Sequence, residues 1–270
     1  MRVSVLATPS SRHQVIHQQA MADGLRKMGH EPVLIHYARQ CTTKHVAVWG
    51  WRNGKALRDM GHEVLVMERG YVGDRFKYTS LGWNGLNGHA TFPAYEDDKG
   101  KRFTEHGGRM LPWNSMGGES VLILGQVPTD MSLQGKDLIP WYESIVKQVD
   151  AIGLEPVFRP HPDLARKGIK QVVKGATPST GSLDDALADA MFSVCYNSNS
   201  SVDSVLAGVP CVIGNKGSMA TPVCHLIEDR LLLPVGFQEG CAREEWANQL
   251  AFKQWGIEEI AAAVPLWKLF

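Results

Sequence analysis

The sequence lacks the features that mark membrane-spanning, disulfide-stapled and zinc-binding proteins. No apolar run reaches the roughly 18 residues that a membrane span needs, and the short apolar stretch at the N-terminus predicts a strand rather than a signal peptide. The five cysteines form no CxxC pair and leave one over, which argues against a disulfide framework and a zinc site. We therefore expect free thiols, a cytoplasmic location, and neither a metal nor a membrane span.

Common nucleotide-binding and hydrolase motifs are absent too. The chain holds no GxxxxGK[ST], no GxGxxG after its first strand, no HExxH and no GxSxG. Kinase or ATPase chemistry, a simple NAD enzyme and a serine hydrolase are therefore disfavoured. What is present is an ordinary globular composition, with 44% hydrophobic and 21% charged residues.

Charge is unevenly spread, although the net charge is zero. Residues 1–118 hold 16 Lys and Arg against 10 Asp and Glu, a net charge of +6, so the remainder carries −6. Two interpretations stay open: an anionic partner for the first half, or chance.

Alternating apolar and helical segments predict a doubly wound α/β protein. The stretches 25–35 (LRKMGHEPVLI) and 57–67 (LRDMGHEVLVM) echo each other, as expected for two consecutive helix–strand units in which a glycine ends the helix. From 71 to 118 the pattern breaks into a segment rich in glycine and aromatics, which suggests a shaped surface with exposed rings. A second strand–helix series starts at Val121, and the tail predicts helices over 243–255 and 257–263. We therefore expect two Rossmann-like domains with parallel sheets facing a cleft, one over 1–118 and the other over 119–270.

Three polar loops follow strands of the second half, at 125–132, 159–163 and 197–201. Ligands bind at the carboxyl ends of strands in such sheets, so the three loops should line one crevice. The serine-rich loop runs into a helix predicted from Val202, where Ser200 and Ser201 suit either a phosphate or a plain N-cap. Two prolines fix His161 near Arg159, which favours anion binding over a structural corner.

Several blocks together resemble the capsule polysaccharide biosynthesis glycosyltransferases, which include the Kdo transferases of bacterial capsule export. The blocks are VAVWGWRNGKALRDMGHEVLVMERGYVGDR (46–75), LILGQVPTDMS (122–132), FRPHPD (158–163), YNSNSSVDSVLAGVPCVIG (196–214) and WANQLAFKQWGIEEI (246–260). The resemblance implies a GT-B fold, with an acceptor-side domain over 1–118 and a nucleotide-sugar-binding domain over 119–270. It implies sugar transfer from a nucleotide sugar, UDP- or CMP-linked, with no other cofactor. It also implies that the donor phosphates and ribose are held by Gln126, Arg159, His161, Ser198, Ser200 and Ser201. The chain departs from the family at Arg69, which stands where the family has a second acidic residue before Gly70.

Sugar transfer needs a carboxylate or another base on the acceptor side. As the general base or nucleophile we expect Asp74 first, then Glu68, with His13 as a third candidate. The alternative that Asp74 is only a solvated loop residue stays open. The leaving phosphate would be met by Arg159, His161 and the serine turn.

The acceptor is open between two classes. Basic residues interleaved with aromatics suit either hydroxymethylated bases in DNA, the acceptors of a type of glycosyltransferase that phages encode, or an acidic glycan or glycolipid. A chance pattern, with the aromatics simply forming core, stays an open alternative. We expect acceptor contacts from Arg52, Arg75, Lys77 and Trp83. In the DNA case the enzyme would act in a phage-infected host's cytoplasm. A non-catalytic nucleotide-sugar-binding protein and a nucleotide-sugar epimerase are the alternatives of other classes.

Overall fold

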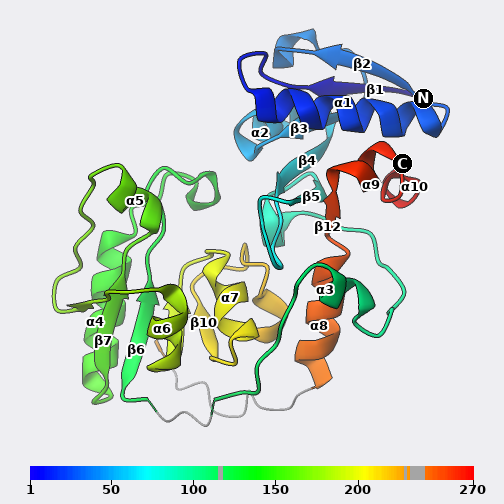
Figure 1. Ribbon diagram of the computed structural model, residues 1–270. Coiled ribbons are helices and arrows are strands. Elements are labelled where there is room, and N and C mark those ends of the chain that lie inside the picture. Colours follow the sequence, from blue (N-terminus) through cyan, green and yellow to red (C-terminus); the bar gives the residue numbers. More distant parts are fainter. Residues whose placement is uncertain (115–117, 228–229, 232–240) are drawn as a thin grey trace. The chain divides into compact units, whose positions relative to one another are not determined.

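The computed structural model describes residues 1–114, 118–227, 230–231 and 241–270 (Figure 1). Within them the chain divides into two compact units, 1–108 with 247–270 and 109–246. Each unit contains one six-stranded sheet. The division differs from the predicted one, because residues 247–270 belong to the first unit and the first break falls at 108 rather than 118.

The first unit is a doubly wound sheet with the strand order β12-β5-β4-β3-β1-β2. Strands β1 to β4 pair in parallel, whereas β5 joins β4 and β12 joins β5 antiparallel. Its strands are β1 (Arg2–Leu6), β2 (Glu31–Ile35), β3 (His45–Trp49), β4 (Glu63–Arg69), β5 (Tyr78–Trp83) and β12 (Gln254–Gly256), and its helices are α1 (Arg12–Lys27), α2 (Trp51–Asp59), α3 (Lys101–Glu105), α9 (Ile257–Ala261) and α10 (Leu266–Leu269). Short 3-10 turns are η1 (Ala38–Gln40) and η2 (Asn87–His89), and α8 (Cys241–Ala251) contains the boundary between the units.

Alternating side chains of these strands fill two cores, one on each side of the sheet. Leu65 and Met67 of β4 join the cluster with α1, α9 and α10, while Val64 and Val66 join the cluster with Leu57 of α2. The echo in the sequence is confirmed as α1–β2 and α2–β4. In both copies the glycine after the helix has a positive φ, 75° at Gly29 and 91° at Gly61, a backbone conformation that favours glycine.

The second unit is an all-parallel sheet with the strand order β11-β10-β9-β6-β7-β8. Its strands are β6 (Ser120–Leu124), β7 (Glu155–Arg159), β8 (Thr177–Pro178), β9 (Ala190–Cys195), β10 (Cys211–Ile213) and β11 (His225–Leu226). Its helices are α4 (Ile139–Ala151), α5 (Pro162–Arg166), α6 (Leu183–Ala188) and α7 (Ser200–Leu206), with 3-10 turns η3 (Met131–Leu133) and η4 (Thr221–Val223). Because β7 lies on one side of β6 and β9 on the other, the chain changes direction at β6, and such switch points bind ligands in open α/β sheets.

Three local expectations need correction. The stretch 71–118 is not an extended aromatic surface, because β5, η2 and α3 lie in it and Tyr71 and Tyr78 are buried. Helix α7 begins at Ser200 rather than Val202. The tail helix ends at Ala251, and β12 follows it, because residues 254–256 complete the sheet edge beside β5.

Candidate functional site

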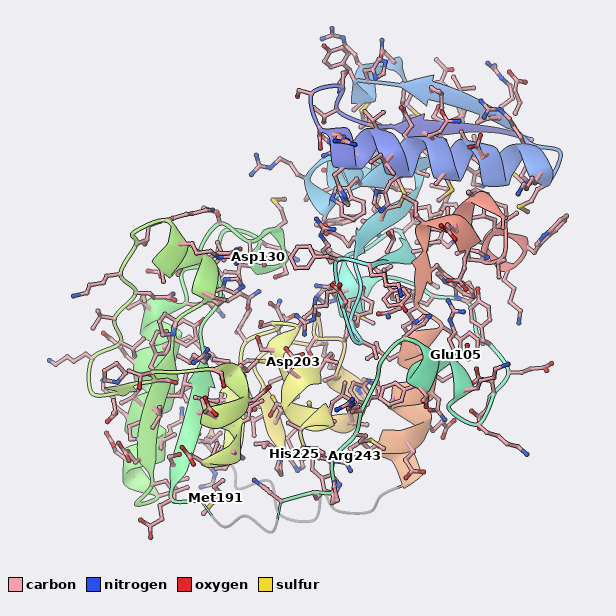
Figure 2. All side chains as sticks on the ribbon, viewed as in Figure 1. Glu105, Asp130, Met191, Asp203, His225 and Arg243 are labelled. Carbon is pink, nitrogen blue, oxygen red and sulfur yellow. The ribbon has the colours of Figure 1, made fainter. Side chains whose placement is uncertain are left out.

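In the second unit, the polar loops after β6 and β9 meet through a buried amide network. Gln126 Nε2 donates to Asn197 Oδ1 at 2.8 Å and to Ser132 Oγ at 2.8 Å, and Asn197 Nδ2 donates to the Ser132 carbonyl at 3.1 Å. Gln126 and Asn197 are 4% and 1% exposed. Asp130, labelled in Figure 2, closes the loop by accepting from the Ser132 N–H at 2.8 Å. The network fixes both loops at the switch point.

One acceptor atom of this network has no donor in the described part of the chain. Gln126 Oε1 is buried without a hydrogen bond, and so is Oε1 of Gln171, whose Nε2 donates to the Gln126 carbonyl at 3.5 Å. Buried polar atoms are almost always hydrogen-bonded, so the two unsatisfied amide oxygens, on residues that contact each other, indicate a place where a ligand can donate. Sequence reasoning singled out Gln126 but missed Gln171, which carries no motif, and Asn197.

Arg159 and His161 occupy the end of β7 and the start of α5. The Arg159 guanidinium donates to the Gly181 carbonyl at 3.0 Å and weakly to Ser179 Oγ at 3.4 Å. His161 is the N-cap of α5, and its Nδ1 accepts from the Asp163 N–H at 3.2 Å. The Gly125 N–H donates to the Arg159 carbonyl at 2.8 Å, which places the β7 end directly beside the β6 loop.

The three serines of the turn differ in accessibility. Ser201 is fully buried, with Oγ donating to the Ser198 carbonyl at 2.8 Å and bonded to Ser218 Oγ at 2.7 Å. Ser198 is 9% exposed and its Oγ lies 3.0 Å from that of the partly exposed Ser200. Ser200 and Ser198 therefore remain candidates for a ligand contact, whereas the Ser201 hydroxyl is committed to structure.

In the first unit, His13 belongs to a layered cluster at the start of α1. Its ring lies 4.1 Å from that of Trp49 and 4.2 Å from that of His17, centroid to centroid. His17 Nδ1 donates to the His13 carbonyl at 2.9 Å, so its Nε2 accepts from Thr79 Oγ1 at 2.7 Å. Burial, and then the nearby His17 and Arg69, lower the pKa of His13 to about 4. Both imidazoles are thus neutral at pH 7.

Glu68 and Asp74 flank the turn after β4 in different surroundings. Glu68 is half-buried and lines a small cavity of about 10 Å³ with Tyr71, Ser80 and Asn87, room for one water or hydroxyl. Asp74 is exposed, and its Oδ1 accepts from the Phe76 N–H at 2.9 Å. Glu68 therefore has the more enclosed carboxylate.

The residues expected to contact an acceptor divide into two groups. Arg52, Arg75 and Lys77 are exposed or half-exposed, whereas Trp83 packs on Phe270 at 5.3 Å against the core. Phe76, between the two basic residues of the loop, is 76% exposed. The guanidinium of Arg69 lies 4.6 Å from the Phe76 ring centroid and 5.4 Å from that of Trp49. This stack of ring, cation and ring was not foreseen from the sequence.

The described residues include no cluster of His, Cys, Asp and Glu able to hold a metal ion. Among the helices described, none combines the length and the apolar character that crossing a membrane requires. The four cysteines at 41, 195, 211 and 224 are free thiols; Cys241 has no described side chain.

No protein-family model and no curated protein matches the sequence. Solved structures do match. The β-Kdo 2,7 transferase of Thermosulfurimonas dismutans KpsC is 15% identical with a TM-score of 0.60, over 99% of this chain and 100% of that chain. The β-Kdo 2,4 transferase of the same protein is 14% identical with a TM-score of 0.55, over 92% and 90%. These matches confirm the predicted fold class, an α/β chain that folds into two Rossmann-like units, as in the solved Kdo transferases.

Proposed function

We propose that the protein is a glycosyltransferase that moves a sugar from a nucleotide-sugar donor to a hydroxyl of an anionic acceptor. The observation that carries the proposal is the full-length match to the fold of a Kdo transferase, at 99% and 100% coverage. The resemblance of the sequence blocks supports the same family.

The donor is assigned to the second unit. Two unsatisfied buried oxygens, on Gln126 and Gln171, suit donors such as ribose hydroxyls or a base amino group. Arg159 and His161, at the adjacent strand end, suit the phosphates of a UDP- or CMP-linked sugar. Preorganised donors of this kind stabilise the departing phosphate by about 3 kcal/mol each.

Glu68 is our first choice as the catalytic carboxylate. It borders a hydroxyl-sized cavity, whereas the carboxylate of Asp74 is exposed and already accepts a backbone N–H. In this assignment Asp74 has a structural role, because its carboxylate accepts from the Phe76 N–H within the turn. The neutral His13 is the second candidate for the general base. Enclosure matters because a partly desolvated carboxylate is a stronger base toward an acceptor hydroxyl than a hydrated one.

Phe76 and its basic neighbours are assigned to the acceptor. An exposed ring flanked by Arg75 and Lys77 suits stacking on a flat group next to negative charge. A hydroxymethylated DNA base satisfies this chemistry, and so does an acidic sugar of a surface polysaccharide. An enzyme acting on a base within duplex DNA would have to extrude it first.

The test is a transfer assay that crosses donors with acceptors. UDP-, CMP-, GDP- and dTDP-sugars are each incubated with DNA containing 5-hydroxymethylcytosine, with the same DNA unmodified, and with an acidic oligosaccharide. We expect one donor class to release nucleotide only with one hydroxyl-bearing acceptor. Glu68→Gln should bind donor normally and lose about 10²-fold or more in turnover. Glu63→Gln, a carboxylate at the other end of β4, is the matched control.

Other outcomes would contradict the proposal. Sugar isomerised without any acceptor would identify an epimerase, and donor binding without turnover would identify a binding protein. Full activity of Glu68→Gln would refute the assignment of that residue.

A further inference from the structure

Gln254, the first residue of β12, makes four hydrogen bonds from a fully buried side chain. Its Oε1 accepts from the N–H of Tyr71 at 2.5 Å and of Val72 at 2.9 Å. Its Nε2 donates to the Val72 carbonyl at 3.0 Å and to Nδ1 of His106 at 3.0 Å. The residue is 0% exposed, and its hydrogen-bonding capacity is used up. The amide is therefore specific for the turn after β4, more than 180 positions away in the sequence.

His106 completes this contact and must be neutral to do so. Because the Gln254 amide nitrogen can only donate, His106 Nδ1 accepts and the ring proton resides on Nε2. The imidazole is 7% exposed and stacks on the Tyr78 ring, with centroids 4.0 Å apart and planes at 24°. It thus holds the Gln254 amide nitrogen in place.

Two glycines of the turn are required by this arrangement. A Cβ on Gly70 would lie 2.9 Å from Gln254 Oε1 and 2.9 Å from the Tyr78 Cβ. Gly73 has φ +65°, and a Cβ there would lie 1.9 Å from the His106 carbonyl. The backbone of the turn therefore approaches Gln254 and His106 too closely for any residue other than glycine at positions 70 and 73. The turn between Glu68 and Asp74 is held by Gln254 at one end and by His106 at the other.

The segment that carries Gln254 is itself anchored. Arg102 Nε donates to the Ala251 carbonyl at 3.1 Å, and its NH2 donates to the Gln254 carbonyl at 3.0 Å. The same guanidinium forms a two-point ion pair with Glu259, at 2.8 and 3.0 Å. The position of the Gln254 side chain is thus set by contacts independent of the turn it holds.

We propose that Gln254 is a positioning residue, by which the C-terminal segment holds the 70–73 turn and thereby Tyr71, which lines the same small cavity as the Glu68 carboxylate. The proposal rests on the function proposed above for that carboxylate. It assigns a role in the acceptor-side chemistry to a residue of the C-terminal block 246–260.

Hydrogen exchange combined with kinetics tests the proposal. In Gln254→Leu we expect the amides of Tyr71 and Val72 to exchange about tenfold faster or more, because their shared acceptor is gone. We expect kcat to fall about tenfold or more, with the KM for the donor unchanged within a factor of about three, since the donor is assigned to the other unit. The matched control is Gln249→Leu, which removes a hydrogen bond to the Tyr95 carbonyl in the same C-terminal segment; it should change neither readout.

Unchanged exchange of both amides in a folded Gln254→Leu variant would overturn the proposal. If that variant does not fold, two variants at His106 test the proposal instead. His106→Phe keeps the ring on Tyr78 but removes the acceptor and should speed exchange, and His106→Asn, with an oxygen near the Nδ1 position, should restore protection. Equal exchange in the two would overturn the proposal. A wild-type protein that transfers no sugar would refute the proposed function, while the exchange data would still decide whether Gln254 holds the turn.

Discussion

Burial lowers the pKa of four histidines of the first unit, at positions 13, 17, 45 and 106, and His17 and His106 are each only 7% exposed. Burial, and then Arg102, lower the pKa of His106 to about 4; Lys77 acts in the same direction, and Glu259 and Asp98 oppose it. The neutral ring is also the hydrogen-bonding form that Gln254 requires. Protonation would therefore break a buried contact.

This pKa predicts an acid-sensitive fold. An unfolded histidine titrates near pH 6.5, so between about pH 6.5 and 4 the unfolded chain binds a proton that the folded chain does not. The free energy of unfolding should fall as the pH drops through this window, with His106 contributing at most about 3 kcal/mol. Urea unfolding at several pH values measures the slope. His106→Asn should flatten it, and an unaltered slope in that variant would contradict the assignment.

The serine-rich turn shows where prediction from single residues stops. The sequence predicted correctly that serines lead into a helix, but the phase of the helix decides which hydroxyl is accessible. Because α7 begins at Ser200, Ser201 and Ser204 share a face three residues apart, and both are fully buried. Ser204 bonds to Ser193 of β9 at 2.7 Å. The start of a helix is the least certain part of any sequence-based assignment, so Ser201 could not be told from Ser200.

At the scale of elements, one partly buried ion pair joins the C-terminal segment to α3. Arg102 of α3 and Glu259 of α9 are 12% and 31% exposed, and the guanidinium lies 3.8 Å from the centroid of the Trp255 ring. Burial alone would raise the pKa of Glu259, but hydrogen bonds from Arg102 and the Gly256 N–H lower it. In the sequence, Arg102 is one of many basic residues of a charged stretch. Its carboxylate partner is 157 positions away, a pairing that no local pattern reveals.

Removing this pair should destabilise the first unit. Arg102→Met should lower the free energy of unfolding by about 2 kcal/mol or more, because a half-buried Glu259 is left unpaired. A double-mutant cycle with Glu259→Gln should give a coupling energy of about 1–2 kcal/mol. Lys55→Met, which breaks the exposed pair with Asp59, should cost less than about 0.5 kcal/mol. Denaturant titration of the four variants and the wild type provides the values. Equal losses at the two sites would rule out an anchoring role for Arg102.

For the whole molecule, the sequence predicted the fold class better than the division of the chain. Hydrophobic periodicity and the glycine-terminated helices were enough to predict two doubly wound units, because these are local signals. The return of residues 247–270 to the first sheet is a long-range event. The strand of residues 247–270, Gln254–Gly256, is only three residues long. It follows a helical pattern, and no residue in the sequence marks where the helix ends. The buried network of Gln126, Asn197 and Gln171 was only partly foreseen for the same reason.

We propose that the second unit holds a nucleotide through the loops after β6, β7 and β9. Calorimetric titration of the wild type with UDP and with CMP tests it directly, with Arg159→Met and Ser201→Ala titrated alongside. We predict that one of the two nucleotides binds and that Arg159→Met raises its Kd about tenfold or more. Ser201→Ala should leave the Kd unchanged, because the Ser201 hydroxyl already hydrogen-bonds to the Ser198 carbonyl and to Ser218. Binding of neither nucleotide, or equal affinity of the wild type and Arg159→Met, would contradict the account.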